Sequence, residues 1–186
     1  MKGRTVMKLD QDIQEILISQ EDLEQRIEEM AAEITRDYAG KAPLLVGILR
    51  GSYIFMADLV RHIDLPVSMD FMVVSSYGAG TVSSGLVNIK KDLEEDIEGK
   101  DVIIVEDILD TGNTLVKLTA ELLKRRPASL KLCVMLDKPD RRTTPIKADY
   151  TGFSIPDAYV VGCGLDYDQG YRQLPYVGVL KPEVYE

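Results

Sequence analysis

Short, uninterrupted apolar runs alternate with helical segments along the chain, and this alternation constrains the fold more than any other feature of the sequence. Such runs cover residues 42–49 and 102–105, and they lack the regular polar positions of strands that have one face in water; a further strand is predicted at 129–136, where Ser129 and Lys131 are polar. Residues 52–63 and about 114–126 lie between them and are predicted to form helices. Since strands that alternate with helices form right-handed crossovers, the sequence predicts an α/β fold with a parallel sheet covered on both faces.

A capped amphipathic helix is predicted near the start of the chain, within residues 19–41. Ser19 and Asp22 form a capping-box pattern at its beginning, and Gly40 can end it. Its apolar residues fall on one face and most of its acids on the other. The pattern indicates a helix that packs on the core with one face and meets water with the other.

The middle of the chain contains a second strand that leads into a stretch of small residues. The strand covers residues 67–74, and residues 75–85 are rich in Ser, Gly, Ala and Thr. That composition cannot pack a core, so we predict a mobile loop there. A polar strand is predicted within residues 86–93, before the apolar run at 102–105.

Composition limits both the number of domains and the class of partner. The 186 residues fit one domain, and a formal net charge of −9 with a pI of about 4.7 argues against a broad nucleic-acid-binding face. Small anions can still bind, because a few local donors suffice to hold a phosphate on an acidic protein.

The sequence also indicates a compartment. It has no N-terminal signal pattern and no apolar run near the roughly 20 residues that a membrane helix needs. Cys133 and Cys163 lie in apolar stretches without metal-ligand spacing, which indicates buried thiols in a reducing environment. We therefore expect a cytoplasmic protein that does not bind membranes.

The stretch VIIVEDILDTGNT, residues 102–114, carries the clearest chemical signal. It joins a strand end to a helix start, where backbone N–H groups without intrahelical partners and the helix dipole favour an anion such as a phosphate monoester. Glu106 and Asp107 would repel a phosphate, but they suit vicinal sugar hydroxyls or Mg²⁺. Phosphate donors beside diol acceptors predict a ribose 5-phosphate site. The alternative is an acid-rich loop in which Asp110 or Thr111 only caps the helix.

This stretch resembles the phosphoribosyl-pyrophosphate (PRPP) motif of the type I phosphoribosyltransferases. Four further segments, in the same order, resemble the hypoxanthine-guanine branch of that family over nearly the whole chain: ILRGSYIFMADLV, VSSYG, LDKPDRR and FSIPDAYVVGCGLDYDQGYRQLPYVGVL. The resemblance implies a twisted, mostly parallel sheet flanked by helices, with a small hood formed from the chain ends. We expect a single domain over residues 1–186, with a core at about 40–145 and the hood from about 1–20 and 150–186.

The resemblance also implies roles for the residues that bind PRPP. Glu106 and Asp107 match the acids that face the ribose hydroxyls and a bound Mg²⁺, and Asp110 matches the carboxylate that accepts the purine N7 proton. This acid can also act by electrostatics alone. The phosphate-binding loop is implied to comprise Asp110, Thr111, Gly112, Asn113 and Thr114.

A second set of residues is implied to bind the pyrophosphate. Arg50 and Gly51 match a loop that has a cis peptide between its first two residues, although many members of the family have Lys at the position of Arg50. Arg172 matches a guanidinium that contacts the pyrophosphate, which suits the bidentate geometry of Arg. Arg142 is a further candidate in this neighbourhood.

The purine-binding residues implied by the resemblance are Lys138, Tyr159, Val160 and Asp166. Lys138 matches a donor to the 6-oxo group; because an ammonium cannot accept a hydrogen bond, it favours 6-oxopurines over adenine. Tyr159 matches the aromatic residue that stacks on the base, and Val160 the residue whose backbone reads its edge. Asp166 matches a carboxylate that reaches a second Mg²⁺, through water.

Ser76 and Tyr77 match the start of a flexible loop that closes over the reaction centre and excludes water. The single histidine, His62, is expected at a helix end, without a catalytic role.

Together these residues predict Mg²⁺-dependent transfer of 5-phosphoribosyl from PRPP to N9 of hypoxanthine or guanine, which gives the purine mononucleotide and pyrophosphate. A preference for xanthine, or for hypoxanthine alone, is an alternative, since all these bases share the 6-oxo group. A nucleotide-sensing, RNA-binding regulator of the same fold is a further alternative, which the acidic charge disfavours. The family commonly forms dimers or tetramers, so we expect a homodimer or homotetramer.

Overall fold

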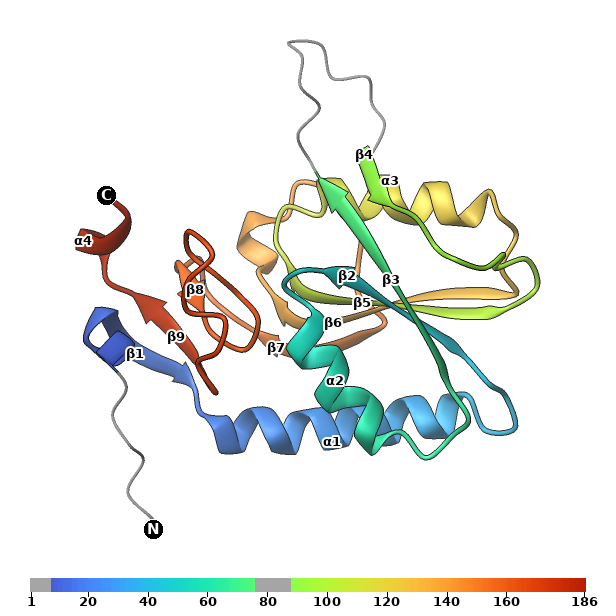
Figure 1. Ribbon diagram of the computed structural model, residues 1–186, viewed down its shortest axis with the longest axis horizontal. Coiled ribbons are helices and arrows are strands. Elements are labelled where there is room, and N and C mark those ends of the chain that lie inside the picture. The colour runs from blue at the N-terminus through green and yellow to red at the C-terminus, as the bar shows by residue number, and fades with distance from the viewer. Residues whose placement is uncertain (1–7, 76–87) are drawn as a thin grey trace.

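The computed structural model describes residues 8–75 and 88–186, which form two sheets and the helices around them (Figure 1). The α-helices are α1 (Gln20–Asp37), α2 (Tyr53–His62), α3 (Asn113–Leu123) and α4 (Pro182–Tyr185), and two 3-10 helices cover Lys8–Asp12 and Pro139–Arg141. The strands are β1 (Ile13–Ile18), β2 (Leu44–Leu49), β3 (Ser68–Ser75), β4 (Asn88–Lys91), β5 (Asp101–Leu109), β6 (Ser129–Asp137), β7 (Tyr150–Ser154), β8 (Val160–Val161) and β9 (Val177–Leu180).

The larger sheet has six strands in the order β4-β3-β2-β5-β6-β7. All neighbours in it are parallel except β3 and β4, which pair antiparallel. Figure 1 shows α1 and α2 on one face of this sheet and α3 on the other. The predicted α/β class, with helices on both faces of a mostly parallel sheet, is confirmed.

Each face of the larger sheet has its own apolar core. One cluster packs α1 and α2 against the sheet, with Met30, Ile34 and Phe55 fully buried. The other packs α3 against the opposite face, with Leu118 and Leu122 fully buried. Residues that are buried on both faces explain why the strands read as continuous apolar runs.

The smaller sheet joins the two ends of the chain. Its order is β1-β9-β8, with antiparallel pairing throughout. The N-terminal strand β1 is therefore an edge strand that pairs with β9, near the C-terminus. In Figure 1 this sheet and α4 lie to one side of the larger sheet. The expected hood from the chain ends corresponds to this sheet. No helix in the described part of the chain is long and apolar enough to span a bilayer.

Several predicted boundaries shift. The Ser19 hydroxyl accepts a hydrogen bond from the Asp22 N–H, as the capping pattern predicted. The strand predicted at 102–105 extends to Leu109, because β6 continues to pair with β5 after β2 has stopped pairing at Val105. Glu106 and Asp107 therefore lie inside a strand rather than beyond it. The helix predicted at about 114–126 is α3, which ends at Leu123.

Candidate active site

A cavity of about 720 Å³ opens at the carboxyl ends of β2 and β5. These strands are parallel neighbours, and the chain runs from them toward opposite edges of the sheet. Open α/β sheets bind ligands at such a switch point. The lining residues come from the ends of β2 and β3, from the end of β5 to the start of α3, and from the segment after β8: Ile48, Leu49, Arg50, Gly51, Val74, Ser75, Glu106, Asp107, Ile108, Asp110, Thr111, Gly112, Asn113, Thr114, Leu115, Asp166, Gln169 and Arg172.

The start of α3 can act as an anion cradle. The N-cap residue is Gly112, which has a φ of 83°, and the Thr111 Oγ1 just before it accepts a hydrogen bond from the Asn113 N–H at 3.4 Å. A Cβ at Gly112 would lie 2.2 Å from Thr144 Oγ1 and 2.6 Å from Ile146 Cγ2. Both the positive φ and the close packing require glycine here. The N–H groups of the first turn, with the helix dipole, thus border the cavity.

Arg142 donates hydrogen bonds to the backbone of the loop that precedes α3. Its Nε donates to the Asp110 carbonyl oxygen at 2.9 Å, its Nη2 donates to the Leu109 carbonyl oxygen at 3.0 Å, and its guanidinium pairs with the Asp137 carboxylate. The candidate role of Arg142 as an anion ligand is therefore not supported by its contacts. These donors fix the backbone of the loop, and Arg142 is absent from the cavity lining.

Glu106 and Asp107 form an electrostatically unfavourable pair. Burial raises the pKa of Glu106 well above its ordinary range, and the neighbouring charge of Asp107 adds to this. Burial also raises the pKa of Asp107 to about 6, although the Ile108 N–H and Arg172 oppose the shift. Among the described residues, Glu106 Oε2 is buried without a hydrogen-bond partner. Such a pair is suited to a cation or to hydroxyl donors.

The loop after β2 packs directly against Asp107. The Leu49–Arg50 peptide is cis, as the resemblance implied. Ser52 is fully buried and its Oγ donates to the Ile48 carbonyl oxygen at 2.7 Å, which fixes the start of α2. A Cβ at Gly51 would lie 1.5 Å from Asp107 Oδ2. Gly51 thus allows the loop and the acid to share one corner of the cavity.

Gly51→Ala is expected to separate these two elements. Since the added methyl group overlaps the Asp107 carboxylate, the loop or the acid must move, and an ångström of displacement at a site can cost about 10²-fold in rate. We expect kcat/KM for PRPP to fall by about that factor in steady-state assays. Gly99→Ala is the control, since it strains the backbone at a φ of 73° with no atom within 4 Å of the Cβ position and outside the cavity lining, and it should leave kcat/KM unchanged. An unchanged kcat/KM in Gly51→Ala would contradict the packing.

The segment after β8, residues 162–176, completes the lining of the cavity. Arg172 Nη2 lies 2.7 Å from Asp166 Oδ1, and its Nη1 donates to the Gly164 carbonyl oxygen at 2.7 Å. The Gln169 N–H donates to Asp166 Oδ2 at 3.0 Å. A Cβ at Gly164 would lie 2.0 Å from the Gly51 carbonyl oxygen, so this segment packs against the loop after β2. The structure therefore brings Arg50, Gly51, Asp166 and Arg172 together.

Lys138, Tyr159 and Val160 lie apart from the cavity lining. Lys138 is 8% exposed, and its Nζ donates to the Ala158 carbonyl oxygen at 2.7 Å. Burial lowers the pKa of this ammonium. The ring of Tyr159 is 41% exposed and stacks on Tyr185 from α4, with centroids 4.8 Å apart, whereas Val160 is buried.

Comparisons with known proteins identify the family of this chain. A family model described as phosphoribosyl transferase domain matches residues 14–168. The chain belongs to the phosphoribosyltransferase family. It is 54% identical over 177 residues to the hypoxanthine-guanine phosphoribosyltransferase of Streptococcus pneumoniae, covering 95% of this chain and 98% of that protein. It is 53% identical over 175 residues to the enzyme of that name from Bacillus subtilis, covering 94% of this chain and 97% of the relative.

A solved structure extends the likeness of this phosphoribosyltransferase to three dimensions. The crystal structure of a hypoxanthine phosphoribosyltransferase from Staphylococcus aureus superimposes with a TM-score of 0.93 at 50% identity. The match covers 98% of this chain and all of that chain. The predicted family and the predicted fold are thereby confirmed, and the chain is an enzyme of the pentosyltransferase class.

Two residues of this phosphoribosyltransferase escaped sequence reasoning. Gln169 lines the cavity between Arg50 and Arg172. The Nε of Arg141 lies 2.8 Å from Asp110 Oδ1, and its Nη1 lies 3.3 Å from Asp157 Oδ1, so Arg141 is a counter-ion for Asp110. Neither residue has a spacing signal, since both act across the fold. Ser76 and Tyr77, predicted at the start of a closing loop, lie outside the described residues.

Proposed function

We propose that this phosphoribosyltransferase transfers 5-phosphoribosyl from PRPP to N9 of hypoxanthine or guanine, with Mg²⁺, and releases pyrophosphate. The observation that carries the proposal is the cavity itself, in which the half-buried acids Glu106 and Asp107 lie beside the start of α3. Relatives that are 54% identical and bear the name hypoxanthine-guanine phosphoribosyltransferase support it. The expected partners are thus PRPP, a 6-oxopurine, the mononucleotide and pyrophosphate, without nucleic acid or membrane.

The 5′-phosphate is proposed to bind at Asp110, Thr111, Gly112, Asn113 and Thr114. There the first turn of α3 offers backbone N–H groups and two hydroxyls. The next part of the cavity holds Glu106 and Asp107, whose oxygens can accept the hydrogen bonds of the ribose diol. A ribose 5-phosphate thereby meets donors at one end and acceptors at the other.

The acids also fit a divalent cation. The oxygen of Glu106 that lacks a partner and the raised pKa values of both acids indicate that this site stabilises added positive charge. No group of three or more His, Cys, Asp or Glu suited to a metal occurs within residues 8–75 and 88–186, so Mg²⁺ would be held jointly with substrate oxygens. When bound, it supplies positive charge that stabilises the departing pyrophosphate. Asp166 is proposed to reach a second such ion through water.

The transfer makes two demands on the site: it must stabilise the leaving pyrophosphate and accept a proton from the purine. Negative charge builds on the departing pyrophosphate, where the backbone at Gly51 and the guanidinium groups of Arg50 and Arg172 can stabilise it. The purine loses its N7 proton as N9 bonds to C1′, and Asp110, which lines the cavity, is proposed to accept that proton.

Recognition of the base is assigned to the residues around Lys138. An ammonium carries three donors, and one of them is used by the Ala158 carbonyl oxygen. The remaining donors favour a 6-oxo acceptor over a 6-amino group. Tyr159 is proposed to stack on the base, and Val160 to present its backbone to the edge of the ring.

Lys138→Met is expected to weaken the use of hypoxanthine selectively. A hydrogen bond from a charged donor contributes roughly 1.5–3 kcal/mol, so kcat/KM for hypoxanthine should fall about 10- to 100-fold. The KM for PRPP should stay within about twofold, because Lys138 does not line the PRPP cavity. Steady-state kinetics with each substrate varied in turn measures both values. An equal loss for PRPP and for hypoxanthine would contradict the assignment.

The proposal is tested by a spectrophotometric assay with PRPP, Mg²⁺ and each of hypoxanthine, guanine, xanthine and adenine. We expect turnover with hypoxanthine and guanine and none with adenine. Dominant turnover with xanthine, or with hypoxanthine alone, would favour the narrower alternatives. Absence of turnover together with RNA binding in a gel shift at near-physiological salt would favour the regulator.

Three broader expectations accompany this function. The core at about residues 40–145 is proposed to carry the PRPP cavity, with the hood from about 1–20 and 150–186 supplying base contacts. We also propose a cytoplasmic homodimer or homotetramer. Light scattering of the purified protein distinguishes these two assemblies from a monomer.

A further inference from the structure

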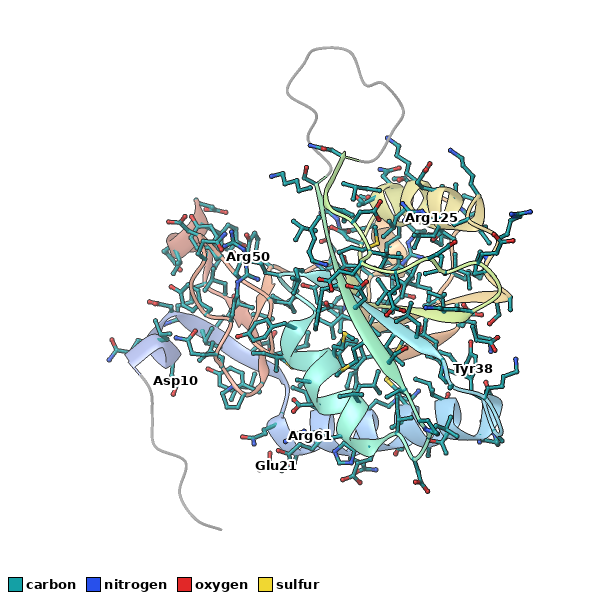
Figure 2. All side chains as sticks on the ribbon, turned by 45° about the vertical axis from the view of Figure 1, so that its right-hand side comes forward. Asp10, Glu21, Tyr38, Arg50, Arg61 and Arg125 are labelled. Carbon is teal, nitrogen blue, oxygen red and sulfur yellow. The ribbon has the colours of Figure 1, made fainter. Side chains whose placement is uncertain are left out.

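The side chain of Arg50 has a partner that its sequence position does not suggest. Its Nη1 donates to Gln169 Oε1 at 2.5 Å, across 119 positions of the chain. Among the described residues this is the single side-chain hydrogen bond of Arg50. Figure 2 shows Arg50 where the segment after β8 approaches the end of β2, and both Arg50 and Gln169 line the cavity.

We propose that Gln169 is a positioning residue that holds the Arg50 guanidinium at the pyrophosphate end of the cavity. The inference rests on the proposed function, which places pyrophosphate beside Arg50, Gly51 and Arg172. Gln169 acts through its amide oxygen, which accepts from Arg50 at 2.5 Å and from Arg172 Nη2 at 3.3 Å. Two cationic side chains from distant elements therefore converge on one neutral acceptor.

The backbone of this segment fixes where the amide points. Asp168, Gln169 and Tyr171 all have positive φ, at 45°, 64° and 71°, although none is glycine. Such residues persist where their surroundings hold them and gather at functional sites. The Gln169 N–H is held by Asp166 Oδ2 at 3.0 Å, and the Gly170 N–H donates to the Tyr167 carbonyl oxygen at 2.8 Å. These hydrogen bonds fix the backbone from which the Gln169 side chain extends.

The neutrality of Gln169 matters for an anion site. An amide oxygen orders a guanidinium without cancelling its charge, so the remaining donors of Arg50 stay available to a phosphate. A carboxylate at the same place would pair with the arginines and repel the anion. Arg172 is already held by Gly164 and Asp166, whereas Arg50 is exposed and depends on Gln169 for its order. A pre-ordered Arg50 loses less side-chain freedom when pyrophosphate binds.

The test is binding of Mg²⁺–pyrophosphate to the full chain by isothermal titration calorimetry, in a double-mutant cycle. Gln169→Ala should raise the Kd about three- to tenfold, the effect of one lost hydrogen bond. In an Arg50→Ala background the same change should have almost no effect, because its partner is gone. Gln169→Glu should weaken binding more than Gln169→Ala. Gln173→Ala, which removes an exposed amide from the same segment, is the matched control and should bind like wild type.

The outcomes separate this inference from the proposed function. An unchanged Kd in Gln169→Ala, an equal loss in the Arg50→Ala background, or no binding of pyrophosphate to the wild-type chain would overturn the role of Gln169. A wild-type chain that binds pyrophosphate with the expected dependence on Gln169, but makes no mononucleotide, would instead overturn the proposed function. In the active enzyme, Gln169→Ala should leave the KM for hypoxanthine unchanged. A loss of folding would lower the apparent kcat and the stoichiometry of pyrophosphate binding rather than raise the Kd.

Discussion

Asp110→Asn is expected to lower kcat with hypoxanthine and PRPP by about 10²–10⁴-fold, the usual worth of a general base. Asp110 lines the cavity beside the start of α3, and Arg141 lies 2.8 Å from its Oδ1. An ionised carboxylate is the form that can accept the purine N7 proton. Asparagine keeps the shape and size of the side chain but removes this acceptor charge. Initial rates under saturating substrates measure the effect.

The same variant separates catalysis from helix capping. Asparagine and aspartate cap helices about equally well, so an Asp110 that served only as a cap would tolerate the change. The N-cap residue of α3 is Gly112, and the hydroxyl that accepts from the first N–H of the helix is that of Thr111 rather than the Asp110 carboxylate. We expect the Tm and the Kd for PRPP of Asp110→Asn to stay near wild type. A kcat within about threefold of wild type would refute the catalytic role.

Local patterns were sufficient to predict five strands of the larger sheet and the three helices on its faces, whereas β7 and the strands of the smaller sheet were not predicted. The uninterrupted apolar residues of β2, and of β6 from Leu132 to Leu136, reflect burial on both faces, which a sequence records position by position. The Ser19 cap needs residues three positions apart, so its signal is also local. The end of β5 was missed, because it depends on pairing with β6, a contact between residues about 28 positions apart along the chain.

The site was predicted unevenly for the same reason. The loop from Asp110 to Thr114 is one contiguous stretch, and its position beside a helix start follows from local rules. The contacts made across the fold do not follow from local rules. Arg142 donates to the loop from 32 positions away, and Arg50 donates to Gln169 across 119 positions of the chain. Such contacts depend on how β2, β5 and the segment after β8 pack together. An isolated arginine or glutamine in a sequence carries no signal of them.

Asp107→Asn is expected to stabilise the protein in the absence of Mg²⁺ and PRPP while it removes their binding. Burial raises the pKa of Asp107 from 3.8 to about 6, so between these values the folded state holds a proton that the unfolded chain has lost. The free energy of unfolding therefore decreases as pH rises through this window and stays reduced above it. At about 1.4 kcal/mol per pKa unit, Asn should add roughly 1–3 kcal/mol at pH 8 and little at pH 4.

Urea unfolding of the metal-free protein at several pH values measures this difference, and Asp101→Asn is the control from the same strand. The Ser129 hydroxyl and then Lys41 lower the pKa of Asp101, so its ionised form contributes stability above its ordinary pKa that is lost as pH falls. Asp101→Asn should therefore destabilise the protein at pH 8, the opposite sign to Asp107→Asn. If Asp107→Asn also destabilised the protein at pH 8, burial of the Asp107 charge would not be the cause of a stability difference. A stabilising Asn that also loses PRPP affinity would show that the charge at Asp107 is kept for its ligand at the expense of stability.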